Sequence, residues 1–453
     1  MSTPTSEAGR GYVRCHPLAG WAAAVMLVGG LERLLLWLFY EPIAYGDTPS
    51  YLRLAGQISG LRFSGYDGTR TPGYPVFLAI LGGDPRRVML AQLVLGWLVS
   101  ILLLWIAWHM TGSARMAGLV ALAYDLIPAM LLFEANLIAE SFTTFWVVLS
   151  LALLVALMGG RRSLSSLGVA FLLGVAVSLA GLTRPLFYIL PVWFLPFVYL
   201  AGQDTLPRRL LRVAVFSLAP VVMLGGWLLF IYRSYDMLSP TTMGGYQLVQ
   251  HTGAFFEYLP EDSAGIRDTY LKYRAAKIAE SGVQTNAIWD AIPEMTQVSG
   301  LSFYGLSGEL ARLSFSLIRQ QPLLYLRSVI EGWIWFWKAP AYWRPEAFPG
   351  VAQVFLRGGV LVGRAIELSA NAAFLVISLS LVIWPAARRR LKPTKQAVAV
   401  AGLIWLTSIV QTLADHGDNP RFLVPLQMLV FLFVAWAASN FKPSSSSNNM
   451  AAR

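Results

Sequence analysis

One aspartate follows the first long apolar segment of the chain, where Asp47 stands within Tyr-Gly-Asp-Thr-Pro at 45–49. Residues 48–58 have the apolar pattern of an amphipathic helix, so this carboxylate lies at a predicted helix N-terminus. Two interpretations fit this position. The side chain caps the helix, which position alone favours, or it acts as a general base on a substrate held at a membrane surface.

Three arginines occur beside prolines in predicted turns at the ends of apolar segments. Arg70 opens Arg-Thr-Pro-Gly-Tyr-Pro, Arg184 precedes a proline, and Arg421 follows one. A guanidinium on a rigid turn is suited to binding a phosphate group through two parallel hydrogen bonds. Each arginine alone also fits a solvated loop charge or an interface residue with its stem along apolar surface. Arg184 and Arg421 together are expected to surround one outer cavity.

Further ionisable residues fall inside apolar segments. Glu140 lies about one turn inside a predicted helical hairpin, and Asn136 stands four residues before it, on the same helix face. An ionisable group at that depth is costly, so Glu140 either pairs with a cation inside the bundle or belongs to a site. Arg33 and Asp125 lie at matching depths in two other predicted helices. We expect them to form a structural ion pair, with Glu32 pointing elsewhere.

The motifs of soluble nucleotide chemistry are missing from the sequence, which has no P-loop, no dinucleotide-binding glycine motif and no serine-elbow motif. The histidines show no pair at metal-binding spacing on one helix, which argues against a structural zinc site; they are His16, His109, His251 and His416. Carboxylates and arginines instead gather at one predicted outer mouth. A base beside cations is the minimum needed to transfer a sugar from a lipid phosphate.

The elements that position these residues are predicted to be membrane helices. Of the 453 residues, 56% are hydrophobic and only 13% are charged, which excludes an ordinary water-soluble enzyme, a disordered chain and a coiled coil. The fold class is therefore an all-α polytopic membrane protein. About ten segments approach the length needed to span a bilayer: 18–40, 88–109, 116–133, 137–158, 165–182, 186–201, 211–232, 365–385, 396–414 and 423–440.

The placement of charge predicts the orientation in the membrane. Lys and Arg in short connections stay on the cytoplasmic side, and here they share the side of the N-terminus, as at Arg115, Arg161 and the cluster at 388–395. Nearly all carboxylates fall on the other side. We therefore expect cytoplasmic N- and C-termini and an active site on the extracytoplasmic face of a cell (inner) membrane. The net charge of +11 mostly reflects this topology, so no nucleic-acid partner is expected.

This topology divides the chain into four parts. They are a transmembrane catalytic module at 1–232 with a first external loop at 41–87, an external juxtamembrane helical segment at 233–364, C-terminal transmembrane helices at 365–440, and a disordered cytoplasmic tail at 441–453. The stretch 322–340 is either a span or a helix at the outer interface. The interface is favoured, because a single extra span would place the basic cluster at 388–395 outside.

The motifs occur in an order that resembles a known group of enzymes. The first helix is followed by Tyr-Gly-Asp, a surface helix, Arg-Thr-Pro-Gly-Tyr-Pro, Ala-Asn-Leu-Ile-Ala-Glu-Ser-Phe at 135–142, Leu-Thr-Arg-Pro at 182–185 and Arg-Phe-Leu-Val-Pro-Leu at 421–426. This ordered set covers nearly the whole chain. It resembles the C-type (GT-C) polytopic glycosyltransferases, especially the branch of protein O-mannosyltransferases and the bacterial aminoarabinose transferase.

The resemblance implies roles for individual residues. Asp47 matches the family's catalytic base towards the acceptor, and Glu140 matches an acidic residue that lines the same cavity. Cations near the lipid phosphate match Arg70, Arg184 and Arg421. The expected substrate cavity includes Tyr45, Asn136, Tyr246 and His416. The family's charged pair after the first aspartate is weak here, where Thr48 and Ser50 stand, so no cofactor is assigned and a divalent metal is left open.

The expected function is therefore sugar transfer at a membrane. One sugar, a hexose or a pentose, would move with inversion from a polyprenyl-phosphate carrier to a cell-envelope acceptor, which is a lipid, a polysaccharide or a protein hydroxyl. The alternative is a flippase or transporter of a lipid-linked sugar, in which the same charges line a path. A transporter usually shows a two-fold repeat, and the sequence shows none clearly.

Overall fold

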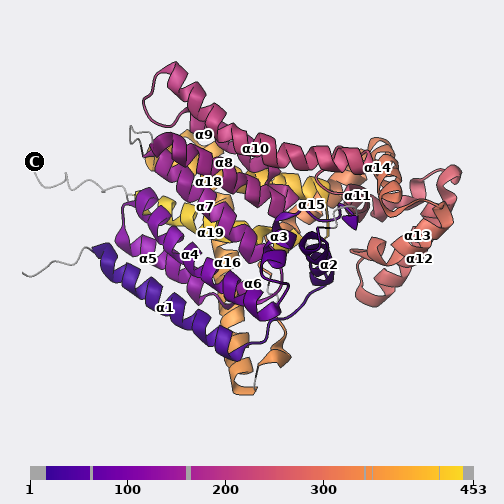
Figure 1. The fold of residues 1–453 in the computed structure, drawn as a ribbon, viewed down its shortest axis with the longest axis horizontal. Coiled ribbons are helices and arrows are strands. Elements are labelled where there is room, and N and C mark those ends of the chain that lie inside the picture. Colours follow the sequence, from indigo (N-terminus) through magenta and orange to yellow (C-terminus); the bar gives the residue numbers. More distant parts are fainter. Residues whose placement is uncertain are drawn as a thin grey trace, which may run out of the picture.

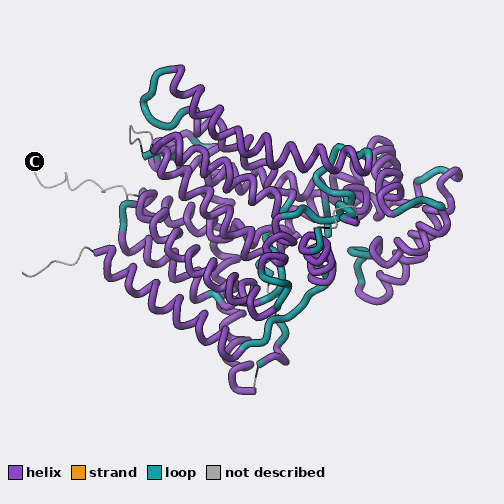
Figure 2. The backbone as a smooth tube through the Cα atoms, viewed as in Figure 1, coloured by secondary structure: helices purple, strands orange, loops and turns teal. Residues whose placement is uncertain are grey.

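The computed structural model describes residues 17–61, 65–159, 165–340, 343–348, 350–417 and 419–441. Every regular element within these ranges is a helix (Figure 2). The expected tail at 441–453 lies outside the described residues from position 442 onwards. The predicted all-α architecture is therefore the one observed.

Eight of the described helices are long and apolar enough to cross a membrane. They are α1 (Pro17–Phe39), α4 (Pro85–Thr111), α7 (Glu140–Met158), α8 (Ser165–Thr183), α10 (Leu206–Tyr235), α16 (Gly350–Ile383), α18 (Lys395–Ala414) and α19 (Asn419–Asn440). Two more predicted spans are shorter or broken. One is the bent pair α5 (Ala114–Leu126) and α6 (Pro128–Ala135); the other is the 3-10 helix η2 (Pro185–Tyr188) with α9 (Ile189–Tyr199).

The break between α5 and α6 is caused by proline chemistry. Pro128 has no backbone N–H and clashes with the preceding turn, so Ile127 is extended and the two helices meet at 56°. The bend turns Glu134 into the bundle. Its carboxylate receives two hydrogen bonds from Arg33, each 2.8 Å long, while Arg33 Nη1 lies 2.7 Å from Asp125 Oδ1. One buried arginine thus pairs with two buried carboxylates.

A second group of helices lies beyond one end of the membrane bundle, at the right of Figure 1. It contains α11 (Gly244–Thr252), α12 (Ala264–Ser281), α13 (Ala287–Ser299) and α14 (Phe303–Gln320), which share an apolar core of their own. Helix α15 (Pro322–Phe336) then packs against α18 and α19. At 15 residues it is too short for a full crossing, in keeping with the predicted interface helix.

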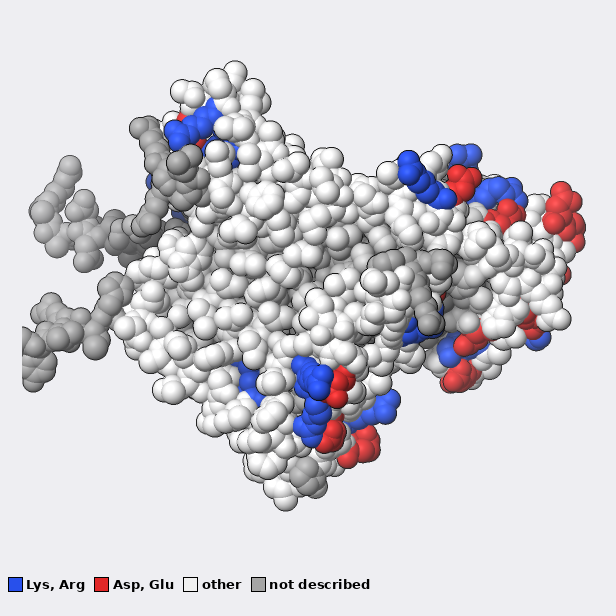
Figure 3. Space-filling model, in the orientation of Figure 1, with Lys and Arg blue, Asp and Glu red and all other residues white. Residues whose placement is uncertain are grey.

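Short helices from the first loop complete this end of the bundle. They are α2 (Thr48–Ser59), where the sequence predicts an amphipathic helix, and α3 (Gly73–Ile80). Gly73 packs directly on the chain at the end of α8, where a Cβ would lie 2.6 Å from the carbonyl oxygen of Leu182. Figure 3 shows charged side chains gathered over the α12–α14 region and around the bundle ends, with an uncharged surface between them. That pattern fits a bundle buried in lipid.

Candidate active site

Five charged side chains from separate parts of the sequence meet where the loops and the bundle join. Asp47 immediately precedes α2, Arg70 lies in the loop before α3, and Glu140 is the first residue of α7. The other two flank apolar helices: Arg184 follows α8, and Arg421 is in the first turn of α19. Prolines fix the chain direction beside both of these arginines, because Pro185 opens η2 and Pro420 lies in the first turn of α19.

The five side chains form one continuous chain of ion pairs. Arg70 Nη2 lies 2.5 Å from Asp47 Oδ1, and Arg421 Nη1 lies 2.7 Å from Asp47 Oδ2. Arg421 also donates through Nε to Glu140 Oε1, and the same oxygen accepts from Nη2 of Arg184. Cations and carboxylates therefore alternate. With three arginines against two carboxylates, the group has a formal charge of +1, which suits an anionic ligand.

Burial and charge set the protonation state of Asp47. Burial favours its neutral form, but the neighbouring Arg70, Arg421 and Arg184 outweigh that effect and hold the pKa of Asp47 below its ordinary value. The carboxylate is therefore ionised throughout the physiological range. Aromatic rings also hold two of the guanidinium groups: Arg70 lies 5.1 Å from the ring centroid of Tyr51, and Arg184 lies 4.8 Å from that of Phe422.

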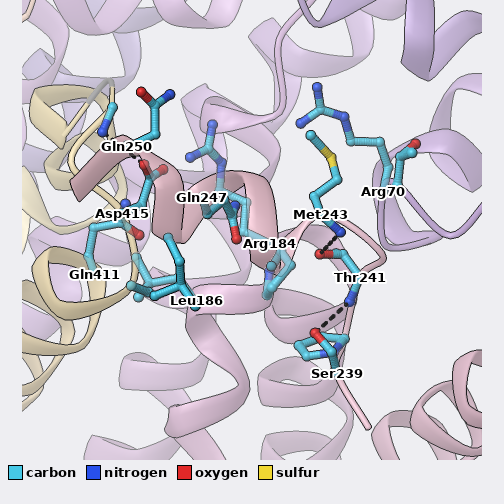
Figure 4. Close-up of a pocket in the computed structure, with 18 of the residues that line it drawn as sticks. Arg70, Arg184, Leu186, Ser239, Thr241, Met243, Gln247, Gln250, Gln411 and Asp415 are labelled. Atoms are coloured by element: carbon cyan, nitrogen blue, oxygen red, sulfur yellow. Dashed lines mark hydrogen bonds between the residues drawn. The ribbon is translucent and has the colours of Figure 1, made fainter. Parts of the chain in front are cut away.

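The network borders a cavity of about 1140 Å³. Four of its members line this cavity together with Tyr45: Asp47, Arg70, Arg184 and Arg421. Figure 4 shows Arg70 on one side of the cavity, with Arg184 and Gln247 between it and a polar group on the opposite side. The volume lies just above the range of about 300–1,000 Å³ typical of small-molecule sites, so it has room for more than a single sugar ring.

In the structure, the side chain of Asp47 does not cap helix α2. Its side chain makes no hydrogen bond to the first turn of α2. The neighbouring Thr48 instead fixes the turn, accepting from the backbone N–H of Tyr45 at 2.9 Å and donating to the carbonyl oxygen of Leu137 at 2.7 Å. This leaves the Asp47 carboxylate aimed at the arginines.

Four expected cavity residues lie elsewhere. Glu140 is completely buried behind Arg184 and Arg421 and lies outside the cavity lining. Asn136 is in the link before α7, not on its helix, and its Oδ1 accepts from the hydroxyl of Tyr40 at 2.9 Å. The other two have structural contacts: the hydroxyl of Tyr246 donates to the carbonyl of Phe303 at 2.7 Å, and the ring centroid of His416 lies 5.4 Å from that of His251.

Several polar residues of the cavity wall were not predicted from the sequence. They include Gln247, Gln250, Gln411 and Asp415. Two features of the sequence could have indicated them: Gln247 and Gln250 share a helix face in α11, and Gln411 and Asp415 are four residues apart just before the Arg421 motif. Their convergence depends on how α11 packs against α18, which no local pattern gives.

The described residues contain no group of three or more His, Cys, Asp or Glu side chains arranged to hold a metal ion. The two carboxylates of the network already pair with arginines.

Comparison with known proteins bears on the fold. No protein-family model matches the chain, and no curated protein sequence does. Among solved structures, the apo oligosaccharyltransferase of Archaeoglobus fulgidus matches with a TM-score of 0.50 at 14% identity, over 92% of this chain and 50% of that one. ArnT from Cupriavidus metallidurans bound to undecaprenyl phosphate matches with a TM-score of 0.36 at 16% identity, over 93% of this chain and 77% of that one.

The present chain thus spans about half the length of the archaeal enzyme. At this identity the likeness shows the fold alone. The prediction of a C-type glycosyltransferase fold in an all-α polytopic membrane protein is confirmed.

Proposed function

We propose that this C-type fold carries a membrane glycosyltransferase that moves one sugar, a hexose or a pentose, from a polyprenyl-phosphate carrier to a hydroxyl acceptor of the cell envelope. The observation that supports this most is the chain of alternating arginines and carboxylates at the edge of the large cavity, formed by Arg70, Asp47, Arg421, Glu140 and Arg184. In a bundle of this fold, that arrangement provides both a phosphate site and a base beside it.

The arginines bind the donor phosphate in this proposal. Arg70, Arg184 and Arg421 all line the cavity, and two of them pair with Asp47. A phosphate placed among them competes with Asp47 for the guanidinium groups. Binding of the donor therefore frees the carboxylate and raises its basicity at the moment it is needed.

Asp47 then acts on the acceptor. The acceptor hydroxyl passes its proton to the carboxylate while its oxygen attacks the anomeric carbon from the face opposite the phosphate. The new glycosidic C–O bond forms as the bond from that carbon to the phosphate oxygen breaks, so the configuration is inverted. Polyprenyl phosphate leaves with the bonding electrons, and the arginines stabilise its negative charge.

Glu140 has a positioning role in this scheme. It is completely buried and touches Arg184 and Arg421, not the cavity. One carboxylate oxygen shared by two guanidinium groups fixes their separation, which keeps them aligned with Asp47 for the transfer step. We assign the site to the extracytoplasmic face of a cell membrane, with both chain termini cytoplasmic, on the charge distribution of the short connections.

The test follows the release of free polyprenyl phosphate. Full-length protein in lipid nanodiscs is given a panel of polyprenyl-phosphate sugars with crude envelope acceptor. Wild type is expected to release the lipid phosphate, and Asp47→Asn to lower that release by about a thousandfold without loss of folding. The matched control is Asp236→Asn, because Asp236 is exposed at the end of α10 in a left-handed conformation that asparagine also adopts.

Two results contradict the proposal. Equal release by wild type and Asp47→Asn removes the base from the mechanism. Movement of a labelled lipid-linked sugar across proteoliposomes with no donor consumed identifies a flippase instead.

A further inference from the structure

The cavity has a second polar wall that the proposed chemistry does not use. It consists of Gln247, Gln250, Gln411 and Asp415, which we call the amide wall. The first two project from α11, Gln411 is near the end of α18, and Asp415 directly follows that helix. Figure 4 shows Gln250, Gln411 and Asp415 together on one side of the cavity, away from Arg70.

Hydrogen bonds hold the amide wall in one arrangement. The Gln250 amide and Asn286 form a reciprocal pair: Gln250 Nε2 donates to Asn286 Oδ1 at 2.9 Å, and Asn286 N donates back to Gln250 Oε1 at 2.9 Å. Gln411 Nε2 donates to Asn419 Oδ1 at 3.2 Å, and Asp415 Oδ1 accepts from the N–H of Gly417 at 2.8 Å. The side chains are therefore already oriented before a ligand arrives, which lowers the entropy cost of binding.

The absence of a side chain at Gly417 allows this close packing. A Cβ there would lie 3.1 Å from Asp415 Oδ1 and 3.2 Å from Gln250 Nε2, so the backbone fits between the two polar groups. Gln250, Gln411 and Asp415 are only 4%, 5% and 9% exposed, yet all three border the cavity. Buried polar groups need hydrogen-bond partners. Beyond the partners named above and the bond from Gln411 to Asp415, Gln250 still has one amide N–H and Gln411 its amide oxygen to offer a ligand.

The charge of the amide wall differs from that of the arginine network. Within the part of the chain that the structure describes, Asp415 takes part in no ion pair. Lys277, the lysine of the cavity lining, pairs with Glu280 at 2.9 Å and with Asp290 at 3.7 Å. The wall therefore offers neutral amides and one carboxylate to a ligand. That set accepts and donates hydrogen bonds to hydroxyl groups and repels an anionic group.

The amide wall is connected directly to the phosphate site. Only five positions separate Asp415 from Arg421 in the sequence. Asn419, which lies between them, accepts a hydrogen bond from Gln411. In Figure 4, Gln247 of the amide wall and Arg184 of the arginine network lie in the middle, between Asp415 and Arg70. A ligand with a phosphate among the arginines can therefore reach the amides with its attached group through the same cavity.

From this geometry we infer that the amide wall is the subsite for the donor's sugar ring, and that it selects a neutral sugar rich in hydroxyl groups. The inference rests on the proposed function, because it takes the arginines as the phosphate site. Gln411 and Gln250 bind hydroxyl groups through their amides, and Asp415 accepts from one or two hydroxyl groups. A sugar that carries a carboxylate is rejected by Asp415.

The experiment separates the affinity for the sugar from the affinity for the phosphate. Full-length protein in nanodiscs is titrated with farnesyl phosphate and with farnesyl-phosphate esters of glucose, mannose, glucuronate and an amino sugar. At least one neutral ester is expected to bind about tenfold more tightly than bare farnesyl phosphate, the amount that one or two new hydrogen bonds supply. The glucuronate ester is expected to gain nothing.

Variants of the amide wall show which residues supply the added affinity for the sugar esters. Gln411→Ala and Asp415→Asn are expected to reduce the tenfold gain to threefold or less, while bare farnesyl phosphate binds no more weakly than before. Gln297→Ala is the matched control, since Gln297 is exposed on α13 and lies outside the cavity lining. Thermal melting of each variant shows that it is folded.

The outcomes are distinguishable. If the gain survives both variants, or if no sugar adds affinity, the inference is wrong although the phosphate site stands. If the amino sugar shows the largest gain and Asp415→Asn removes it, the subsite is selective for a cation and our assignment of a neutral sugar is wrong. If bare farnesyl phosphate does not bind to wild type at all, the proposed function itself fails, and this inference fails with it.

Discussion

Asp415 is a carboxylate whose burial costs stability. Burial raises its pKa from 3.8 to about 6, against the opposing effect of hydrogen bonds from Gly417, Gln411 and His416. An acid whose folded pKa is raised binds its proton more tightly in the folded state, so stability falls as the pH rises from about 4 to 6. At pH 7.5 the ionised group costs the folded state about 3 kcal/mol.

This cost gives a prediction for Asp415→Asn. The variant is expected to be more stable than wild type at pH 7.5, by up to about 3 kcal/mol, and the difference should vanish below pH 4. Thermal melting in detergent over pH 4 to 8 measures it. If Asp415→Asn is less stable than wild type by the same amount at every pH, Asp415 holds the loop in place and is not retained for a ligand.

Glu140 allows a second prediction about a single residue. Glu140→Gln keeps an oxygen near Arg184 and Arg421 but removes the charge that fixes them. We expect kcat to fall about a hundredfold, because the arginines and Asp47 are no longer aligned. The affinity for bare lipid phosphate should rise, since the arginines are less neutralised. Steady-state kinetics and phosphate-lipid titration measure the two effects.

A purely structural role for Glu140 would lower kcat and phosphate affinity together. The matched control is Glu309→Gln, which removes only an exposed contact with Arg312 and should change neither quantity.

A residue of the site could be predicted from the sequence where its contacts follow from its position along one helix. It could not be predicted where its contacts require a bend in the chain or the packing of two helices. The depth of Arg33 and Asp125 in their helices was enough to pair them, because depth follows from residue counts along a helix. Glu134 could not be placed, since it reaches Arg33 only through the bend at Pro128. The amide wall was likewise not predictable, because it forms where α11 meets α18.

At the scale of elements, a glycine on α4 makes room for the bent helix. A Cβ on Gly96 would lie 2.0 Å from the carboxyl carbon of Glu134, so any side chain there must displace it. Gly96→Ala is therefore expected to separate Glu134 from Arg33 and to cost about 3–5 kcal/mol, the penalty for breaking a buried ion pair. The melting temperature of purified protein measures the loss.

The control for Gly96→Ala is a glycine with open space around it. Gly225 lies in α10, and no atom would come within 4 Å of an added Cβ. Gly225→Ala should leave the melting temperature unchanged or raise it, because alanine favours a helix more than glycine does. Equal losses in the two variants would remove the steric argument.

The helices themselves followed from hydropathy, because lipid requires about 20 apolar residues for each crossing. The broken elements were harder to predict, because the prediction used only the length of each apolar segment. A bent pair such as α5 and α6 has the composition of a single span, and η2 with α9 is shorter than a full crossing. Composition gives the length of an apolar segment but not the angle at a proline within it.

For the whole molecule, the arrangement of charge and helices predicts a topology. Helix α1 begins and α19 ends at the same end of the bundle in Figure 1, opposite α12 and α13. The exposed cluster at 388–390 belongs to the predicted cytoplasmic side, and Glu261 belongs to the predicted outer side. The short basic connections favour this orientation over the inverse one.

Cysteine labelling in intact cells tests this topology. The chain has one cysteine, so Cys15→Ser gives a background without thiols. In that background, Glu261→Cys should react with a membrane-impermeant maleimide in intact cells, because the side chain of Glu261 is 85% exposed. Arg389→Cys, on the exposed face of α17 (Pro385–Leu391), should react only after permeabilisation. The reverse pattern would place the arginine network on the cytoplasmic face, where an extracytoplasmic acceptor cannot reach Asp47.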